Sequence, residues 1–282
     1  MRLPEKTSVR SDPRAVGPLG ALRVVIRHRH LVWQLTRREV AARYRGSVLG
    51  FLWSFLIPAV MLAVYTFVFS VAFQARWPGA TTSRTEFALI LFAGLVVFAA
   101  FVEPINRAPM LIVSQPNYVK KIVFPLEILP CVAVGAALFN ALVGFGVLIL
   151  AVAFLRGALP WTVALVPVVL LPLLPLCLGL SWLLAALGVF LRDISPLVTV
   201  LTQVLMFVTP IFYPLAAIPE PYRRVIALNP LALTVEQVRG LVFYGRGPDW
   251  TSFAACLGVG LAVGWLGLSF FQRTRSGFAN VL

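Results

Sequence analysis

Few residues in this chain have the types and spacing that catalysis needs. The two histidines, His28 and His30, lie in a basic N-terminal segment and fit a membrane interface better than a catalytic role. The ten acidic residues are scattered singly, and the H-E-x-x-H and G-x-S-x-G patterns are absent. No G-x-x-x-x-G-K-S/T loop is present, so the chain does not hydrolyse ATP itself. The sequence predicts no catalytic residue, and an ATP-driven process would need a motor on another polypeptide.

The three cysteines do not predict a metal site. Cys131, Cys177 and Cys256 each lie inside an apolar run, without C-x-x-C spacing or a second ligand type in register. We therefore expect small packing residues, with no metal ion and no cofactor in this chain.

Aromatic residues make up 12% of the chain and have the most informative spacing. Tyr65, Phe69 and Phe73 recur every four residues, which places them on one face of a helix. Four more rings belong to the candidate set: Trp53, Phe207, Phe212 and Tyr213. Rings along a wet path would suit sugars, whose C–H faces stack on aromatic surfaces while their hydroxyls stay hydrated. Packing between helices or against lipid would give the same spacing, so both interpretations stay open.

Composition indicates that the elements carrying these rings are membrane spans. Hydrophobic residues form 60% of the chain, charged residues 12%, and the mean hydropathy is +0.92. A water-soluble domain of 282 residues could not cover so much apolar surface. The net charge of +14 does not predict a nucleic-acid partner, because the arginines flank apolar runs and form no continuous basic face.

We predict an all-α membrane protein with six transmembrane helices. A helix rises about 1.5 Å per residue, so roughly 20 apolar residues cross the bilayer core. Three prolines, Pro167, Pro172 and Pro175, predict a kink or break in the fourth span. The expected spans are 48–73, 87–113, 128–155, 161–191, 194–214 and 251–271.

The residues before the first span form a separate unit, 1–46, in front of the spanning domain 47–282. Residues 1–18 predict a cytosolic tail, and 19–44 have the apolar and basic spacing of an amphipathic helix in the interface plane. A partly ordered basic tail is the alternative. The segment ends in a basic collar at the membrane: Arg37, Arg38, Arg43 and Arg45. No apolar core typical of a cleavable signal peptide is present in these residues.

Charge counting gives the topology. With six spans, 17 Lys and Arg residues fall on the side of the N-terminus and seven on the other side. Cytosolic loops carry the excess of basic residues, so both termini are expected in the cytosol.

Two connecting segments are unusual. The loop after the second span, about 115–125, is short, amphipathic and closed by Pro125, and it would dock into a groove on a cytosolic partner, with Phe124 as anchor. A basic loop without a partner is the alternative. The expected docking residues are Asn117, Tyr118, Lys120, Lys121 and Phe124. We expect Glu103 and Glu127 to pair with the nearby Arg107 or Lys121, although a coupling role for either carboxylate stays open.

The segment between the fifth and sixth spans, 215–249, holds two apolar pieces that are too short to span. Two short re-entrant helices would fit, because broken helices at membrane depth must pack on protein or line a wet cavity. An interfacial loop lying flat fits equally well.

Four ordered stretches resemble one family. They are RYRGSVLGFLWSFLIPAVMLAVYTFVFS (43–70), NYVKKIVFPLEILP (117–130), GVFLRDISPLV (188–198) and, more loosely, NPLALTVEQVRGLVFYG (229–245). These stretches resemble the membrane subunit of polysaccharide ABC exporters of the type-2 class. That family includes the Wzm-type O-antigen permeases and their capsule and teichoic-acid relatives.

The resemblance implies a half-transporter in the bacterial cytoplasmic (inner) membrane. It would pair with a second copy of itself and with two copies of a cytosolic ATPase subunit, which would bind ATP and Mg²⁺. The stretch 115–125 would be the coupling helix. Spans one and five would line the path of a lipid-linked polysaccharide, which makes Tyr65, Phe69, Phe207 and Phe212 candidate channel residues.

Three alternatives stay open. A type-2 exporter of small molecules or lipids would favour an aliphatic path over an aromatic one. An integral-membrane glycosyl or acyl transferase would need acidic and basic residues clustered in one aqueous loop, whereas the carboxylates here are single. A channel would need a selectivity filter, and no stretch resembles one.

Overall fold

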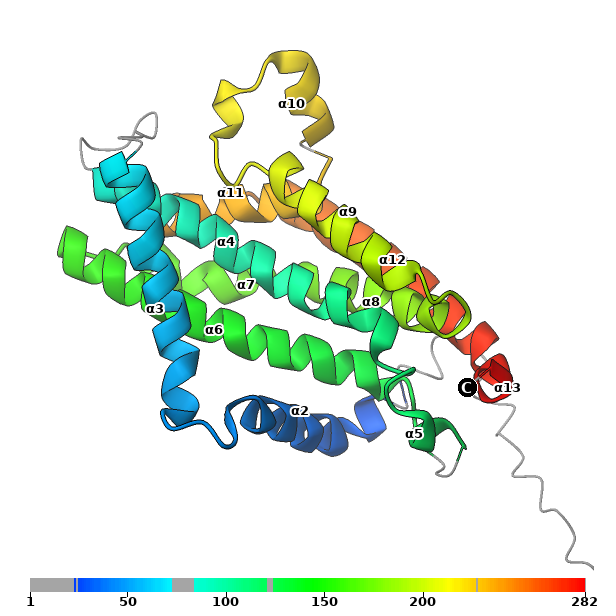
Figure 1. Ribbon diagram of the computed structural model, residues 1–282. Helices are drawn as coiled ribbons and strands as arrows, with labels where there is room; N and C mark the ends of the chain where they lie inside the picture. Colours follow the sequence, from blue (N-terminus) through cyan, green and yellow to red (C-terminus); the bar gives the residue numbers. More distant parts are fainter. Residues whose placement is uncertain (1–22, 24, 73–83, 121–123, 227, 282) are drawn as a thin grey trace, which may run out of the picture.

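The computed structural model describes residues 23, 25–72, 84–120, 124–226 and 228–281, and every regular element in these ranges is a helix (Figure 1). The expected all-α class is confirmed. The α-helices are α2 (Arg29–Tyr44), α3 (Trp53–Thr66), α4 (Arg84–Arg107), α5 (Pro116–Lys120), α6 (Ile128–Arg156), α7 (Val166–Leu170), α8 (Leu173–Phe190), α9 (Ile194–Val208), α10 (Glu220–Ile226), α11 (Pro230–Phe243), α12 (Trp250–Thr274) and α13 (Phe278–Val281).

Five helical stretches of the described residues are long and apolar enough to cross a membrane: Gly50–Phe69, Glu86–Met110, Ile128–Arg156, Trp161–Phe190 and Trp250–Val281. They correspond to the first four and the last of the expected spans. The expected fifth span, 194–214, contains α9, a helix of only 15 residues. At about 1.5 Å per residue α9 is roughly 22 Å long, shorter than a bilayer core of about 30 Å. A sixth crossing therefore stays a prediction.

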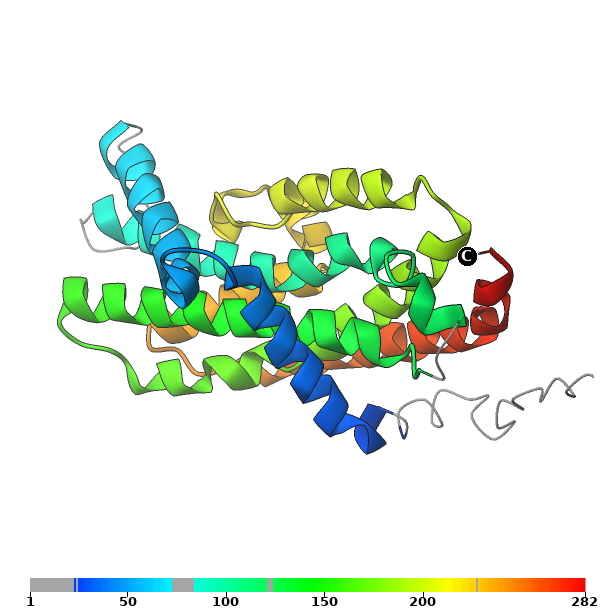
Figure 2. The same ribbon diagram turned by 60° about the horizontal axis from the view of Figure 1, so that its bottom comes forward.

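The helices are covered to very different degrees. In the most apolar stretch of α4, 72% of the residues are buried, against 6% in the stretch that contains α3. Helices α4 and α6 pack side by side at the centre, and α3 leans on their outer face (Figures 1 and 2). Helix α2 crosses one end of the bundle and packs on α6. At the same end α13 contacts α5. The central helices are therefore fixed within one chain, whereas α3 has a large uncovered face.

Helices α8 and α12 are in backbone contact. A Cβ atom at Gly267 would lie 1.9 Å from the Gly179 carbonyl oxygen, and one at Gly179 would lie 2.4 Å from the Val263 carbonyl oxygen. Side chains on either glycine would push the helices apart, so this approach depends on small residues, as is common between spans.

The proline-rich fourth span is broken, as predicted. A short 3-10 turn covers Trp161–Leu165, α7 follows, and α8 starts only after Pro172. Proline removes a backbone donor and clashes with the preceding turn, which explains the interruption.

The segment 215–249 forms two short helices with different surroundings. Helix α10 stands out at one side of the molecule (Figure 1), whereas α11 packs against α4, α7 and α12. Both ends of α11 are satisfied by hydrogen bonds. Asn229 Oδ1 accepts from Leu231 N–H at 3.0 Å, while Thr162 Oγ1 donates to the Leu241 carbonyl at 2.6 Å and Arg156 Nη1 to the Phe243 carbonyl at 2.6 Å. A short helix with satisfied ends can be buried without the cost of orphan polar groups.

Candidate functional site

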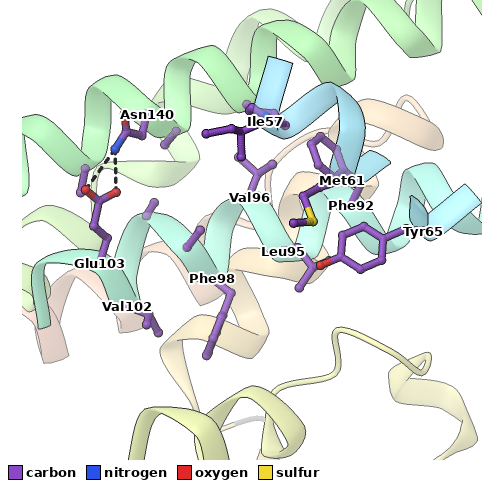
Figure 3. A pocket seen from close by; sticks show the side chains of 16 residues that line it. Ile57, Met61, Tyr65, Phe92, Leu95, Val96, Phe98, Val102, Glu103 and Asn140 are labelled. Atoms are coloured by element: carbon purple, nitrogen blue, oxygen red, sulfur yellow. Dashed lines mark hydrogen bonds between the residues drawn. The ribbon is translucent and has the colours of Figure 1, made fainter. Parts of the chain in front are cut away.

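A cavity of about 430 Å³ lies between α3, α4 and α6, and it contains one of the predicted aromatic residues (Figure 3). Its walls are almost entirely apolar, with Met61 of α3 opposite Phe92 and Val96 of α4. Tyr65 lines the cavity and is half-buried there. A mainly apolar pocket with a few polar groups is the usual form of a binding cavity.

One end of this cavity is polar. Asn140 Nδ2 of α6 donates to both carboxylate oxygens of Glu103, at 3.0 and 2.8 Å (Figure 3). Arg43 Nη2 lies 2.5 Å from Glu103 Oε1. A second cavity of about 420 Å³ adjoins this end and is lined by Arg43, Trp53 and Asn140 among others. The predicted residues Arg43 and Trp53 thus share one site, and Asn140 is a member that the sequence did not reveal.

The aromatic row on the first span does not continue as a regular α-helix. Helix α3 ends at Thr66, and Phe67–Ala72 forms a π-helical turn. In a π-turn four residues still make nearly one full turn, so the spacing keeps Tyr65 and Phe69 near one face, and both rings pack against the same core. Phe69 is half-buried, with its ring 5.4 Å from that of Phe87. Phe73 lies outside the described residues, and its role stays a prediction.

The second aromatic group surrounds the end of α9. The rings of Phe207 and Phe212 stack at 5.9 Å between centroids, and Phe207 is 64% exposed. The Tyr213 hydroxyl donates to the Phe207 carbonyl at 2.8 Å and reaches the Val208 carbonyl at 3.3 Å. These carbonyls belong to the last turn of a helix, where intrahelical partners are missing. Tyr213 therefore caps α9, and its ring is held beside the Phe207–Phe212 stack.

Arg239 of α11 fixes the chain immediately after α9. In the sequence it was only one of the seven basic residues counted on the side opposite the N-terminus. Its side chain is 1% exposed. The guanidinium donates to the carbonyls of Pro210 at 2.6 Å, Ile211 at 2.7 Å and Ile90 at 3.2 Å, and it pairs with Glu236 at 2.9 Å. The available signal was a single arginine inside an apolar stretch, which in a membrane protein points to a specific partner.

The expected coupling segment is folded onto the protein itself. Helix α5 covers Pro116–Lys120, and the rings of Tyr118 and Phe124 stack at 4.4 Å with an angle of 13° between their planes. Both rings are half-buried against a cluster formed by the ends of α6, α8 and α12. Asn117 is exposed, whereas nothing is described of the Lys120 side chain or of Lys121. Docking of Phe124 on a partner stays a prediction, with one half of its surface covered by its own chain.

Glu103 and Glu127 pair with residues that lie far from them in the sequence. We expected Glu103 to pair with Arg107. Instead Glu103 pairs with Arg43, and Arg107 pairs with Glu39. The expected pairing was wrong because the packing of α2 on α6 brings Glu39 and Arg43 within reach of the end of α4. Glu127 is 2% exposed and pairs with Arg275, which was not among the expected partners, while Lys121 is outside the described residues.

The remaining members of the basic collar are as exposed as Arg43. Arg37, Arg38 and Arg45 are exposed. Their contact with lipid headgroups stays a prediction. The cysteines Cys131, Cys177 and Cys256 are all buried and unpaired, in agreement with a packing role.

Comparisons with known proteins identify the family and confirm the resemblance. The ABC-2 type transporter family matches residues 30–243. The O-antigen export system permease protein RfbA of Myxococcus xanthus is 32% identical over 262 residues, covering 92% of this chain and 98% of the relative. The protein of the same name from Klebsiella pneumoniae is 26% identical over 251 residues (88% and 93%). The polysialic acid transport protein KpsM of Escherichia coli is 24% identical over 252 residues (84% and 90%). This chain therefore belongs to the ABC-2 type transporter family.

Proposed function

We propose that this chain is the permease half of an exporter that moves a lipid-linked polysaccharide across the bacterial cytoplasmic membrane. Relatives named for O-antigen export and for polysialic acid transport, aligned over at least 84% of the chain, carry this proposal. The family match at residues 30–243 includes both α5 and α11, and the alignment with the Myxococcus xanthus relative covers 98% of that protein, so the likeness is to a whole permease and not to one segment.

In the proposed assembly two copies of the chain pair, and two ATPase subunits bind ATP and Mg²⁺ on the cytosolic side. The uncovered face of α3 and that of α9 support the pairing, since large apolar side chains on both helices are exposed. They include Phe55, Val60, Met61 and Val64 on α3 and Leu197, Val200, Val204 and Phe207 on α9. Exposed apolar surface of this extent favours either lipid or a second protein chain.

The proposed orientation places both termini in the cytosol. Helices α5 and α13 meet at the end of the bundle that α2 crosses, so the basic N-terminal helix, the coupling segment and the C-terminal helix belong to one side. Basic residues accumulate on cytosolic segments, which supports this assignment.

The proposed path uses the two aromatic groups. One aromatic group lies at the end of the first span and the other at the end of α9. Within one chain α3 and α9 stand apart (Figures 1 and 2), so in the proposed dimer the second copy would supply the helix that faces each group. Rings at Tyr65, Phe69, Phe207 and Phe212 would contact the C–H faces of successive sugars without holding one of them tightly. ATP-driven movement of the motor subunits would be passed to the α5 segment and would open the path.

Reconstitution tests this function directly. The chain and its ATPase subunit, in proteoliposomes loaded with lipid-linked polysaccharide, should move the polymer across the bilayer only with ATP and Mg²⁺. A complex with an inactive ATPase subunit is the control. ATP-dependent movement of phospholipids or drugs, with the polysaccharide left in place, would instead assign a small-molecule or lipid exporter.

A further inference from the structure

Four charged residues join the interface helix to a membrane span in a reciprocal pattern. Glu39 and Arg43 are four residues apart on α2, and Glu103 and Arg107 are four residues apart on α4. A spacing of four places both members of each set on one helix face. Arg43 pairs with Glu103 at 2.5 Å, and Glu39 pairs with Arg107. We call these four residues the charge clamp.

The pairing fixes the direction of α2 as well as its position. Moving up α2 from residue 39 to 43 corresponds to moving down α4 from residue 107 to 103, so the two segments oppose each other. A reversed α2, or one shifted by a turn, would bring like charges together. Asn140 of α6 also donates to the Glu103 carboxylate, at 2.8 and 3.0 Å, so the orientation of this carboxylate is fixed by a third helix as well.

The clamp lies between the two regions that the proposed function uses. Glu39 lines a cavity of about 240 Å³ together with Tyr118 of the α5 segment. Arg43 lines the cavity that contains Trp53, the first residue of α3. The second half of α2 therefore lies beside the coupling region, and its C-terminal end is joined to α3 through residues 45–52.

We propose that the charge clamp makes α2 a rigid strut, which carries displacement of the α5 segment to α3 during transport. This inference rests on the proposed function, in which movement of the ATPase subunits is passed first to the α5 segment. The clamp residues are positioning residues, because they act through α5 and α3 and are not proposed to contact the substrate.

Stability alone gives a poor account of the clamp. The side chains of both pairs are between 23% and 37% exposed. Ion pairs at the surface contribute little to folding, and these two pairs are partly of that kind, although Glu39 Oε1 and Arg107 Nη1 are themselves buried. Reversing one charge should therefore leave the helices in place while it removes the fixed register between α2 and α4.

Charge reversal tests the proposal, and the Glu39–Arg107 pair is the better choice because neither residue lines the cavity beside α3. E39R and R107E should each reduce polymer export about tenfold per ATP hydrolysed, with normal amounts of complex in the membrane. The combined E39R/R107E variant should recover at least half of wild-type export. R29E, which alters an exposed charge on the same helix, is the matched control and should export normally.

Two results would overturn the proposal. One is normal export by both single variants. The other is a combined variant that assembles normally but does not recover export. Neither result can come from a simple loss of folding, because the amount of complex is measured in each case.

A cross-linking arm separates this inference from the proposed function. Cysteines at positions 39 and 107, joined by a short bismaleimide, should link α2 to α4 in the membrane. The joined complex should keep its export and ATPase activities if α2 moves as a strut with α4. Loss of both on cross-linking would show that the helices must separate, and the strut would be rejected. If the wild-type complex moved no polysaccharide, the proposed function would fail. The efficiency of cross-linking and the ATPase rate would still show whether residues 39 and 107 are in contact and whether α2 and α4 move together.

Discussion

Gly94 of α4 leaves the space that the guanidinium of Arg239 occupies. A Cβ atom at residue 94 would lie 3.0 Å from Arg239 Nη2 and 3.3 Å from Val235 Cγ1. The guanidinium in turn binds the Pro210 and Ile211 carbonyls, where the chain leaves α9. Because Gly94 of α4 has no side chain, Arg239 has room to bind these two carbonyls and to fix the backbone where α9 ends.

Gly94→Ala should therefore destabilise the protein through overpacking. Added methyl groups in a packed interior cost about 1–3 kcal/mol. We expect a lower Tm for the purified protein, measured by thermal unfolding in detergent. Gly146→Ala on α6, where a Cβ would meet no atom within 4 Å, is the matched control and should unfold at or above the wild-type Tm, because alanine favours the helix. Equal Tm values for the two variants would contradict the conclusion that Arg239 and Val235 fill the space beside Gly94.

Arg239→Met should have a larger effect than Gly94→Ala. It leaves the Pro210 and Ile211 carbonyls without their donor, at about 1–3 kcal/mol for each buried group. We expect much lower amounts of protein in the membrane, and partial recovery in Arg239→Lys, which keeps one charged donor. Arg246→Met removes an exposed arginine that lies over the Tyr244 ring, and it should accumulate normally.

Replacing Tyr65 and Phe69 together by leucine should impair export about tenfold while sparing assembly. Leucine keeps apolar contacts but removes the flat surface on which a sugar would stack. Polymer export and the amount of complex are measured side by side. Phe154→Leu on α6 is the control, because Phe154 is 90% exposed and lines neither cavity beside α3. Full export by the double variant would remove these two rings from the proposed path.

The stacked pair in the α5 segment predicts a coupling defect. Phe124→Ala removes the partner of Tyr118, and an aromatic pair contributes about 0.5–1.5 kcal/mol beyond its buried area. We expect less polymer exported per ATP hydrolysed, with the complex still formed. Phe124→Tyr retains the ring and should behave normally. Lys120→Ala addresses the docking surface separately, and unchanged export and ATPase coupling in both alanine variants would argue against a coupling role.

The start of α12 should show a measurable pH dependence. The Ser252 hydroxyl donates to Asp249 at 2.6 Å, and together with the Ser252 and Thr251 backbone N–H groups it lowers the pKa of the Asp249 carboxyl below its usual value. A lowered folded-state pKa means that the carboxylate stabilises the folded state at higher pH. This contribution is lost as the pH falls below about 4 and through the folded-state pKa.

Asp249→Ala should cost about 0.5–1 kcal/mol at pH 7, the usual effect of removing a helix cap. Asp249→Asn keeps an acceptor for Thr251 N–H but does not titrate in this range. Its Tm should therefore fall less on acidification than that of the wild type. Parallel Tm curves for the two proteins between pH 7 and 3 would contradict the assignment.

Local patterns in the sequence were sufficient to predict most helices. The uncharged run that forms α6 is expected at 128–155 and observed at Ile128–Arg156, because its length and hydropathy leave few other structures in a bilayer. The break in the fourth span follows equally directly from its prolines.

Long-range contacts explain what the sequence did not reveal. Helix α9 ends at Val208, before the expected limit of 214, and the residue that stabilises this end, Arg239, lies 31 positions from it along the chain. Glu103 pairs with Arg43 across 60 residues although Arg107 is only one turn away. Charge and hydropathy identify such residues as ionic or apolar, but only the packing of α2 on α6 and of α11 on α4 selects their partners.

The small buried share of α3 also has a consequence for biosynthesis. A ribosome delivers the chain from its N-terminus, so α3 is the first span to enter the bilayer and the one with the least surface covered by its own chain. Its neighbours α4 and α6 are synthesised later, and they cover only one of its faces. We therefore expect α3 to wait in contact with lipid or the insertion machinery and to reach its final place last. The earliest of these spans to be made is thus the one whose maturation is completed latest.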